Sequence, residues 1–118
     1  VMIDFLRGHP KAVDLVKKNA DKIIIPAIVS AELYAGVRGE SELKVLDNLL
    51  GVFRTIPISA ELARKGGLLK NEFAKSHGTG LADAIIAATA LSEKASLKTL
   101  NTKHFPMIKN LRPPYRKE

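Results

Sequence analysis

The stretch that decides how this chain folds is Gly78-Thr79-Gly80-Leu81-Ala82-Asp83-Ala84-Ile85-Ile86-Ala87-Ala88-Thr89-Ala90-Leu91. The two glycines around Thr79 indicate a loop with unusual backbone angles or a close approach by another segment. The Ala, Ile and Leu residues that follow predict a helix that is apolar on almost every side. We expect this helix to be buried, with a neighbouring backbone packed closely against its alanines.

One carboxylate lies in the first turn of this predicted helix. Asp83 is the only charged residue between His77 and Glu93. It can be structural, because with Gly80 as the N-cap it occupies a capping-box position and favours the helix dipole by about 0.3–1 kcal/mol. It can also be a ligand, because a carboxylate on a buried helix is usually paired or bound to a cation. This stretch alone leaves both interpretations open.

Length and composition limit the class of protein. The 118 residues suffice for one domain with a proper core, and we expect a single domain spanning residues 1–118. The absence of cysteine excludes a disulfide framework, a thiol nucleophile and Cys-ligated zinc. No apolar run approaches the roughly 18 residues of a membrane span, and a cytoplasmic protein is expected.

The charge balance favours a polyanionic partner. The net charge is +7, and nucleic acid is the commonest partner of such a basic chain. A basic surface that only keeps the protein soluble would give the same net charge. The chain has two Tyr, four Phe and no Trp, which argues against an aromatic platform for stacking single-stranded bases.

Helical and strand patterns alternate along the chain. Short β-branched or apolar runs predict strands at residues 22–26, 54–58 and 96–100, and helical spacing predicts helices at 10–21, 27–39, 40–53, 59–77 and 81–91. This alternation is typical of a three-layer α/β domain with a mostly parallel sheet.

Three polar residues are expected to meet at one end of that sheet. Glu32 closely follows the first predicted strand, Asn101 directly follows the last, and Asp83 opens the helix before it. Ligands of parallel sheets gather at the carboxyl ends of the strands. Carboxylate and amide oxygens suit Mg²⁺ or Mn²⁺, and such ions support phosphodiester cleavage. A glutamate that reaches solvent or pairs with Arg7 or Arg38 is the simpler interpretation of Glu32.

Four short sequence motifs occur in a fixed order along the chain and are more specific than any single residue. With these motifs the chain resembles the PIN-domain ribonucleases, specifically toxins of the VapC type. The resemblance covers practically the whole chain. The motifs are Asp4-Phe5-Leu6-Arg7-Gly8; Ile25-Pro26 with Ser30-Ala31-Glu32-Leu33-Tyr34-Ala35-Gly36; His77-Gly78 with Gly80-Leu81-Ala82-Asp83-Ala84 and Ala87-Ala88-Thr89-Ala90; and Thr99-Leu100-Asn101-Thr102-Lys103-His104-Phe105.

The resemblance implies an endoribonuclease that depends on Mg²⁺ or Mn²⁺ and hydrolyses RNA phosphodiester bonds. It implies homodimers, and a VapB-type antitoxin that inserts a peptide near the site. Carried onto this sequence, Glu32 and Asp83 match the metal-binding acids of the family. Asn101 falls where many members have Asp and others Asn, so it would be a weaker ligand or would orient water.

The same resemblance suggests side chains for the substrate. Ser30 and Thr79 would lie beside the site and bind water or phosphate. Lys103 and His104 would touch RNA, although a surface lysine and a capping histidine explain these two residues equally well.

The chain departs from the family pattern at its beginning. Family members carry a first strand that ends in a metal-binding Asp just before the residues matching Val1-Met2-Ile3-Asp4, and Asp4 is not its substitute. We expect the functioning protein to carry that strand. Without it, the chain would be a catalytically silent module that binds RNA or an antitoxin-like partner. A related nuclease acting on DNA or in RNA maturation, without an antitoxin, is a further alternative.

Overall fold

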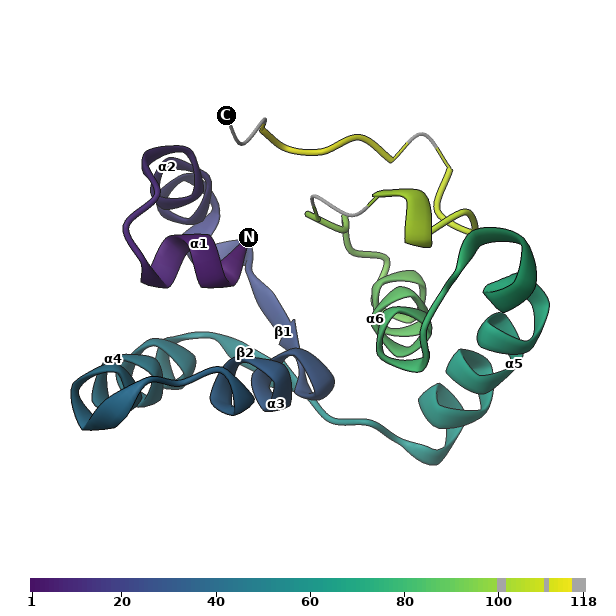
Figure 1. Ribbon diagram of the computed structural model, residues 1–118, viewed down its shortest axis with the longest axis horizontal. Coiled ribbons are helices and arrows are strands. Elements are labelled where there is room, and N and C mark those ends of the chain that lie inside the picture. The colour runs from purple at the N-terminus through teal and green to yellow at the C-terminus, as the bar shows by residue number, and fades with distance from the viewer. Residues whose placement is uncertain (100–101, 110, 116–118) are drawn as a thin grey trace. The chain divides into compact units, whose positions relative to one another are not determined.

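The computed structural model of the protein describes residues 1–99, 102–109 and 111–115 (Figure 1). The chain forms two compact units: unit 1 is Val1–Pro57 and unit 2 is Ile58–Glu118. The single domain expected from the sequence stays a prediction. None of the described helices is long and apolar enough to cross a membrane.

Unit 1 combines helices with a small parallel sheet. Its elements in chain order are α1 (Met2–Leu6), α2 (Pro10–Asn19), the 3-10 turn η1 (Ala20–Lys22), β1 (Ile24–Pro26), α3 (Ala27–Ala35), α4 (Gly39–Val52) and β2 (Arg54–Ile56). Pro10 is the first residue of α2, where its missing N–H costs no hydrogen bond. The predicted helices at 10–21, 27–39 and 40–53 are therefore confirmed: the first two end a few residues earlier, and the third is shifted by one residue.

The sheet of unit 1 consists of β1 and β2. The two strands run parallel with Ile24 opposite Arg54 and Pro26 opposite Ile56. Both lie within the runs that the sequence predicted as strands. Together with the helices between them they confirm the α/β class and the parallel pairing.

The core of unit 1 lies between its sheet and its helices. Val16 of α2, Ile25 of β1 and the buried Phe53 before β2 form one apolar cluster, and partly buried Leu49 and Leu50 of α4 pack against it. Burying side chains of this size stabilises the fold by roughly 1.5–3 kcal/mol each. Of the apolar positions of the 40–53 pattern, Leu46, Leu49, Leu50 and Phe53 are therefore buried or partly buried as predicted, whereas Leu43 is exposed.

A hydrogen bond links α3 to α4 at the surface. The Tyr34 hydroxyl donates to Oδ1 of Asp47 over 2.6 Å. The Asp47 carboxylate, mainly through this hydrogen bond, raises the pKa of Tyr34. Charge and hydrogen bonding here join two helices that follow each other directly in the chain.

Unit 2 contains the alanine-rich stretch from Gly78 to Leu91. Its elements are α5 (Ala60–His77), α6 (Leu81–Ser92) and the 3-10 turn η2 (Thr102–His104). Ser59 caps α5, since its hydroxyl accepts a hydrogen bond from the backbone N–H of Leu62 over 3.1 Å. Gly78 ends α5 with φ 65°, a left-handed conformation that glycine adopts without steric cost. Both ends of α5 agree with the sequence.

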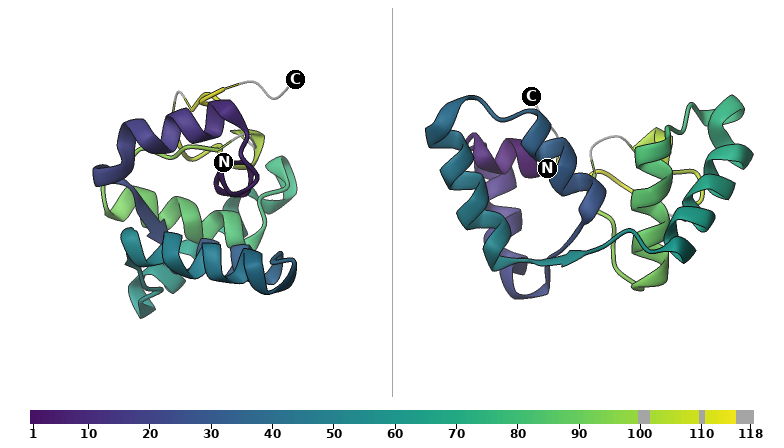
Figure 2. Two further views of the ribbon diagram at one scale, coloured as in Figure 1. Left: turned by 90° about the vertical axis from the view of Figure 1, so that its left-hand side faces the viewer. Right: turned by 90° about the horizontal axis from the view of Figure 1, so that it is seen from below.

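Helices α5 and α6 pack side by side in unit 2 (Figure 2). Half of the residues of α6 are buried, including Ala84, Ala87 and Ala88, none of which has exposed surface. At Gly66 the helices approach so closely that a Cβ atom would lie 2.8 Å from Cγ1 of Ile85. This confirms the predicted close packing on the alanine-rich helix and assigns the close contact to Gly66, whereas Gly67 faces open space.

The predicted third strand is wrong for its described residues. Residues 96–99 have no strand structure, and Leu100 lies outside the described residues. A strand is defined by its ladder with a neighbour, and the described part of unit 2 contains no other strand. The apolar pattern of this segment therefore does not suffice to make a strand.

Candidate active site

Asp83 lies in the first turn of α6. Gly80, with extended backbone angles, is the N-cap, and its carbonyl accepts the hydrogen bond of the Ala84 N–H over 3.0 Å. The Asp83 side chain is 29% exposed. Among the described residues its recorded polar contact is with His104, and no capping-box hydrogen bond returns to Gly80. The capping-box hydrogen bond is therefore not formed, while the predicted position of Asp83 in the first turn after Gly80, where it favours the helix dipole, is confirmed.

His104 reaches Asp83 from the turn η2. Its Nδ1 atom lies 3.2 Å from Oδ2 of Asp83, and its side chain is 31% exposed. The two residues are 21 positions apart in the chain, so no local pattern reveals this contact. The carboxylate thus keeps access to solvent while one of its oxygens is held.

Thr79 ties the same two segments together. Its side chain is buried, with 1% exposed, and its Oγ1 donates to the backbone carbonyl of His104 over 2.8 Å. In unit 2, Thr79, Asp83 and His104 therefore form one group of contacts. Sequence reasoning selected all three, but it did not foresee that Thr79 holds His104.

The predicted site residues of unit 1 lie on α3. Glu32 is exposed and Ser30 is half-buried. Glu32 forms no ion pair with Arg7 or Arg38 within the described part of the chain. The carboxylate of Glu32 is therefore open to a ligand. Its exposure agrees with a glutamate that reaches solvent and not with one that is paired with an arginine.

Two further candidates lie around η2. Lys103 is exposed beside His104. Asn101 lies outside the described residues. Their predicted roles, contact with RNA and completion of the metal site, stay predictions.

The donor chemistry of these residues fits a hard divalent cation. Glu32 and Asp83 both present carboxylates to solvent, and carboxylate oxygens are the preferred ligands of Mg²⁺ and Mn²⁺. Within neither unit do three or more His, Asp or Glu side chains of the described residues converge. Of the predicted ligands, Asp83 is the one that the structure describes in unit 2, and His104 is its polar neighbour.

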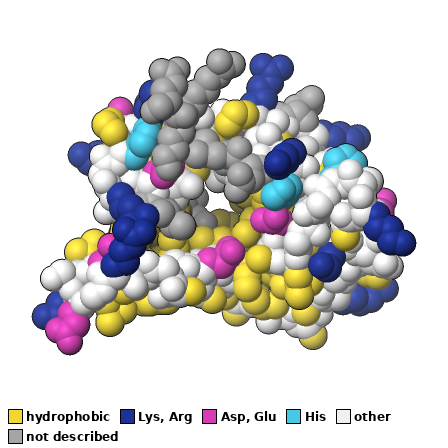
Figure 3. All heavy atoms as spheres, in the orientation of Figure 1, with side chains coloured by type: hydrophobic (Ala, Val, Ile, Leu, Met, Phe, Trp, Pro, Cys, Tyr) yellow, Lys and Arg dark blue, Asp and Glu magenta, His cyan; other side chains and the backbone are white. Residues whose placement is uncertain are grey.

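The basic charge of the chain is distributed. On the face shown in Figure 3, Lys and Arg side chains stand at several separate places. Lys and Arg residues occur in both units, and positive charge of this kind attracts polyanions in general.

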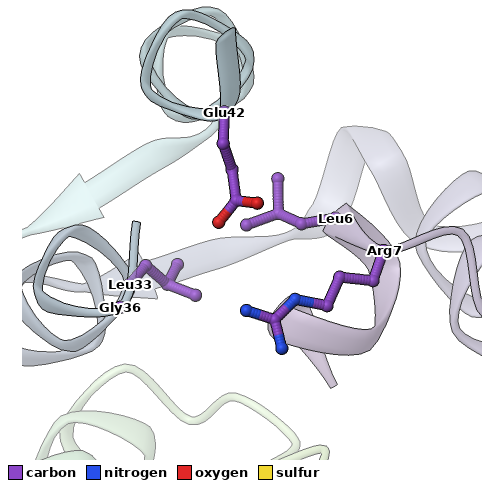
Figure 4. A pocket seen from close by; sticks show the side chains of 5 residues that line it. All are labelled: Leu6, Arg7, Leu33, Gly36 and Glu42. Atoms are coloured by element: carbon purple, nitrogen blue, oxygen red, sulfur yellow. The ribbon is translucent and has the colours of Figure 1, made fainter. Parts of the chain in front are cut away.

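A small pocket in unit 1 contains none of the predicted site residues. It is lined by Leu6, Arg7, Leu33, Gly36 and Glu42, and the side chains of Arg7 and Glu42 extend toward it (Figure 4). The Glu42 carboxylate also accepts a hydrogen bond from the backbone N–H of Arg38 over 3.2 Å, which supports the start of α4.

Comparison with known proteins identifies the family. The model of the PIN domain matches residues 1–109. The chain belongs to the PIN-domain family. It is 40% identical to ribonuclease VapC19 of Mycobacterium tuberculosis, over 98% of this chain and 94% of that protein, and 40% identical to ribonuclease VapC10 of the same organism, over 98% and 88%. Within the PIN-domain family the chain therefore belongs to the VapC type.

More distant comparisons agree. Ribonuclease VapC2 of Rickettsia felis is 36% identical over 90% of this PIN chain and 85% of that protein. A solved chain described as a toxin-antitoxin complex from Klebsiella pneumoniae matches with a TM-score of 0.84 and 28% identity, over 98% of this chain and 93% of the other. The PIN fold predicted from the sequence motifs is thereby confirmed.

Proposed function

We propose that this protein is a divalent-metal-dependent endoribonuclease and the toxin of a type II toxin-antitoxin pair. The observation that carries the proposal is the 40% identity, over nearly the whole chain, to two proteins named as ribonucleases. The half-buried carboxylate of Asp83, the exposed carboxylate of Glu32 and the net charge of +7 support it. Together these features suit a substrate that is a polyanion and a cofactor that is a cation.

Glu32 and Asp83 would hold Mg²⁺ or Mn²⁺, and Asn101 would complete the site. When bound, such an ion supplies positive charge against the phosphate and makes water a better nucleophile. Asp83 contributes a carboxylate at the N-terminal end of a buried helix, on a rigid element that keeps its position. Precise positioning of this kind favours catalysis, because small displacements of ligands are costly.

The remaining residues would bind the RNA. Lys103 is exposed on η2, next in the chain to His104, and can contact phosphate oxygens there. Ser30 and Thr79 would bind phosphate or ordered water near the site, with the Thr79 hydroxyl limited by its bond to the His104 carbonyl.

The proposal includes partners and a location. The solved relative from Klebsiella pneumoniae is described as a toxin-antitoxin complex, which supports a VapB-type antitoxin as the partner of this chain. We further propose a homodimer acting in the cytoplasm, where RNA and antitoxin are made. The test is co-expression: an antitoxin should copurify with the protein and suppress its activity.

RNA cleavage by the full chain with added Mn²⁺ tests the proposed activity. Asp83→Asn keeps the shape of the side chain but removes its charge, and we expect cleavage to fall by about 100-fold or more, because even residues behind metal ligands change activity by roughly 10–100-fold. Asp14→Asn is the matched control, since Asp14 is an exposed helical aspartate of α2. It should cleave like the unmodified protein.

Two results would contradict the proposal in different ways. Cleavage that persists in Asp83→Asn would remove Asp83 from the site. Absence of cleavage in the unmodified protein, with RNA or antitoxin binding that survives EDTA, would instead favour the silent binding module.

A further inference from the structure

We infer that His104 is a positioning residue: it orients the carboxylate of Asp83 for the cation and is itself held in place by Thr79. The inference rests on the proposed function, because it assigns a role toward the metal ligand Asp83. It also differs from the sequence prediction, in which His104 and Thr79 contact the substrate. Its basis is the group of contacts in unit 2.

The geometry around Asp83 distinguishes its two carboxylate oxygens. The side chain of an aspartate in the first turn of a helix can rotate, and both of its oxygens are then equivalent. Here Nδ1 of His104 lies 3.2 Å from Oδ2, which breaks this equivalence. No hydrogen bond to the other oxygen, Oδ1, is recorded among the described residues. One oxygen is therefore held, and the other remains for a ligand.

The backbone of His104 is fixed by its neighbours in unit 2. A 3-10 turn of three residues is weak by itself, because its hydrogen-bond geometry is poor. Two anchors fix this one: the buried side chain of Phe105, with 3% exposed, and the hydrogen bond from Thr79 Oγ1 to the His104 carbonyl. The backbone that carries the imidazole is thus tied to the loop from which α6 starts.

The two contacts link Thr79, His104 and Asp83 to one another. Thr79 lies four residues before Asp83, in the loop that leads into α6, and it holds the backbone of the residue whose side chain holds Asp83. Because Thr79 fixes His104 and His104 contacts Asp83, a substitution of Thr79 should also change the orientation of the Asp83 carboxylate. Carboxylates that bind metals are commonly oriented by such hydrogen-bonded neighbours, which change metal affinity by roughly 10–100-fold.

Titration calorimetry of Mn²⁺ into the full chain tests the inference without relying on activity. We expect His104→Ala to weaken Mn²⁺ binding by about 10-fold or more. His104→Asn should restore binding to within about threefold, because its amide nitrogen replaces Nδ1 as a hydrogen-bond donor. His77→Ala is the matched control, an exposed histidine of the same unit whose Nδ1 contacts Ser76, and it should bind Mn²⁺ like the unmodified protein.

Thr79 supplies a second and independent pair of variants. Thr79→Val keeps the shape but removes the donor to the His104 carbonyl, and it should weaken Mn²⁺ binding by about threefold to 10-fold. Thr79→Ser keeps the donor and should bind nearly normally. In cleavage assays His104→Ala should lower kcat with little change in KM for RNA, as expected for a residue that acts through Asp83.

Three outcomes would overturn the inference. Normal Mn²⁺ binding by His104→Ala with a raised KM would make His104 a substrate contact. Equal loss of binding in His104→Ala and His104→Asn would make the imidazole a direct ligand. Normal Mn²⁺ binding by Asp83→Asn would remove Asp83 as a ligand and His104 as its positioning residue, whereas the proposed function itself fails only if the unmodified protein does not cleave RNA.

Discussion

Two neighbouring glycines of α5 should respond to the same substitution with opposite signs. Gly66 faces α6, and a Cβ there would lie 2.8 Å from Cγ1 and 3.1 Å from Cα of Ile85. Gly67 is the next residue of the same helix, and a Cβ there would meet nothing within 4 Å. Gly66→Ala and Gly67→Ala therefore share their effect on the helix and differ only in packing.

The magnitudes follow from these distances. In a helix interior, replacing Gly by Ala stabilises by about 1 kcal/mol, so Gly67→Ala should raise Tm by about 4 °C. Gly66→Ala gains the same stabilisation of the helix, but its new methyl group overpacks the contact with Ile85. This overpacking lowers the free energy of unfolding by roughly 1–3 kcal/mol. We expect the upper part of that range, because the Cα of Ile85 cannot move without its helix. Tm should then fall by about 4–8 °C.

Thermal and urea unfolding, followed by circular dichroism, measures both variants. A double-mutant cycle with Ile85→Ala isolates the contact, because this change removes the Cγ1 atom that Gly66→Ala would meet. Ile85→Ala alone should cost about 2–5 kcal/mol, and in its background Gly66→Ala should become less harmful by about 0.5–1 kcal/mol. The reasoning would be refuted if Gly66→Ala stabilised as much as Gly67→Ala, or if the cycle showed no coupling.

Two further predictions concern a helix cap and the RNA surface. Ser59→Ala removes the acceptor for the Leu62 N–H at the start of α5, and unfolding should show a loss of about 1 kcal/mol, whereas Ser59→Asp should lose much less. Lys103→Ala should weaken RNA binding equally for all sequences and lower the slope of log affinity against log salt by about 0.7, measured by fluorescence anisotropy. An unchanged slope would separate Lys103 from the phosphates, and Lys98→Ala tests another exposed lysine of unit 2.

Local signals in the sequence were sufficient for most elements. Ser59 and Gly78 mark the ends of α5, and Pro10 marks the start of α2, where the structure has them. A cap or a stop acts through hydrogen bonds within about four residues, so its effect can be read from neighbours in the chain. The segment 96–99 is different, because a strand needs a partner that its own residues do not specify.

For the candidate site, too, some features follow from the sequence and others only from the tertiary structure. The sequence by itself determined the buried alanine-rich helix, the carboxylate in its first turn and, through four ordered motifs, the PIN-domain family. Only the tertiary structure decided that His104 meets Asp83, that Thr79 holds His104, and that Gly66 and not Gly67 touches Ile85. These contacts join residues about 20 or more positions apart, and such pairs are set by how segments pack, which no local spacing encodes.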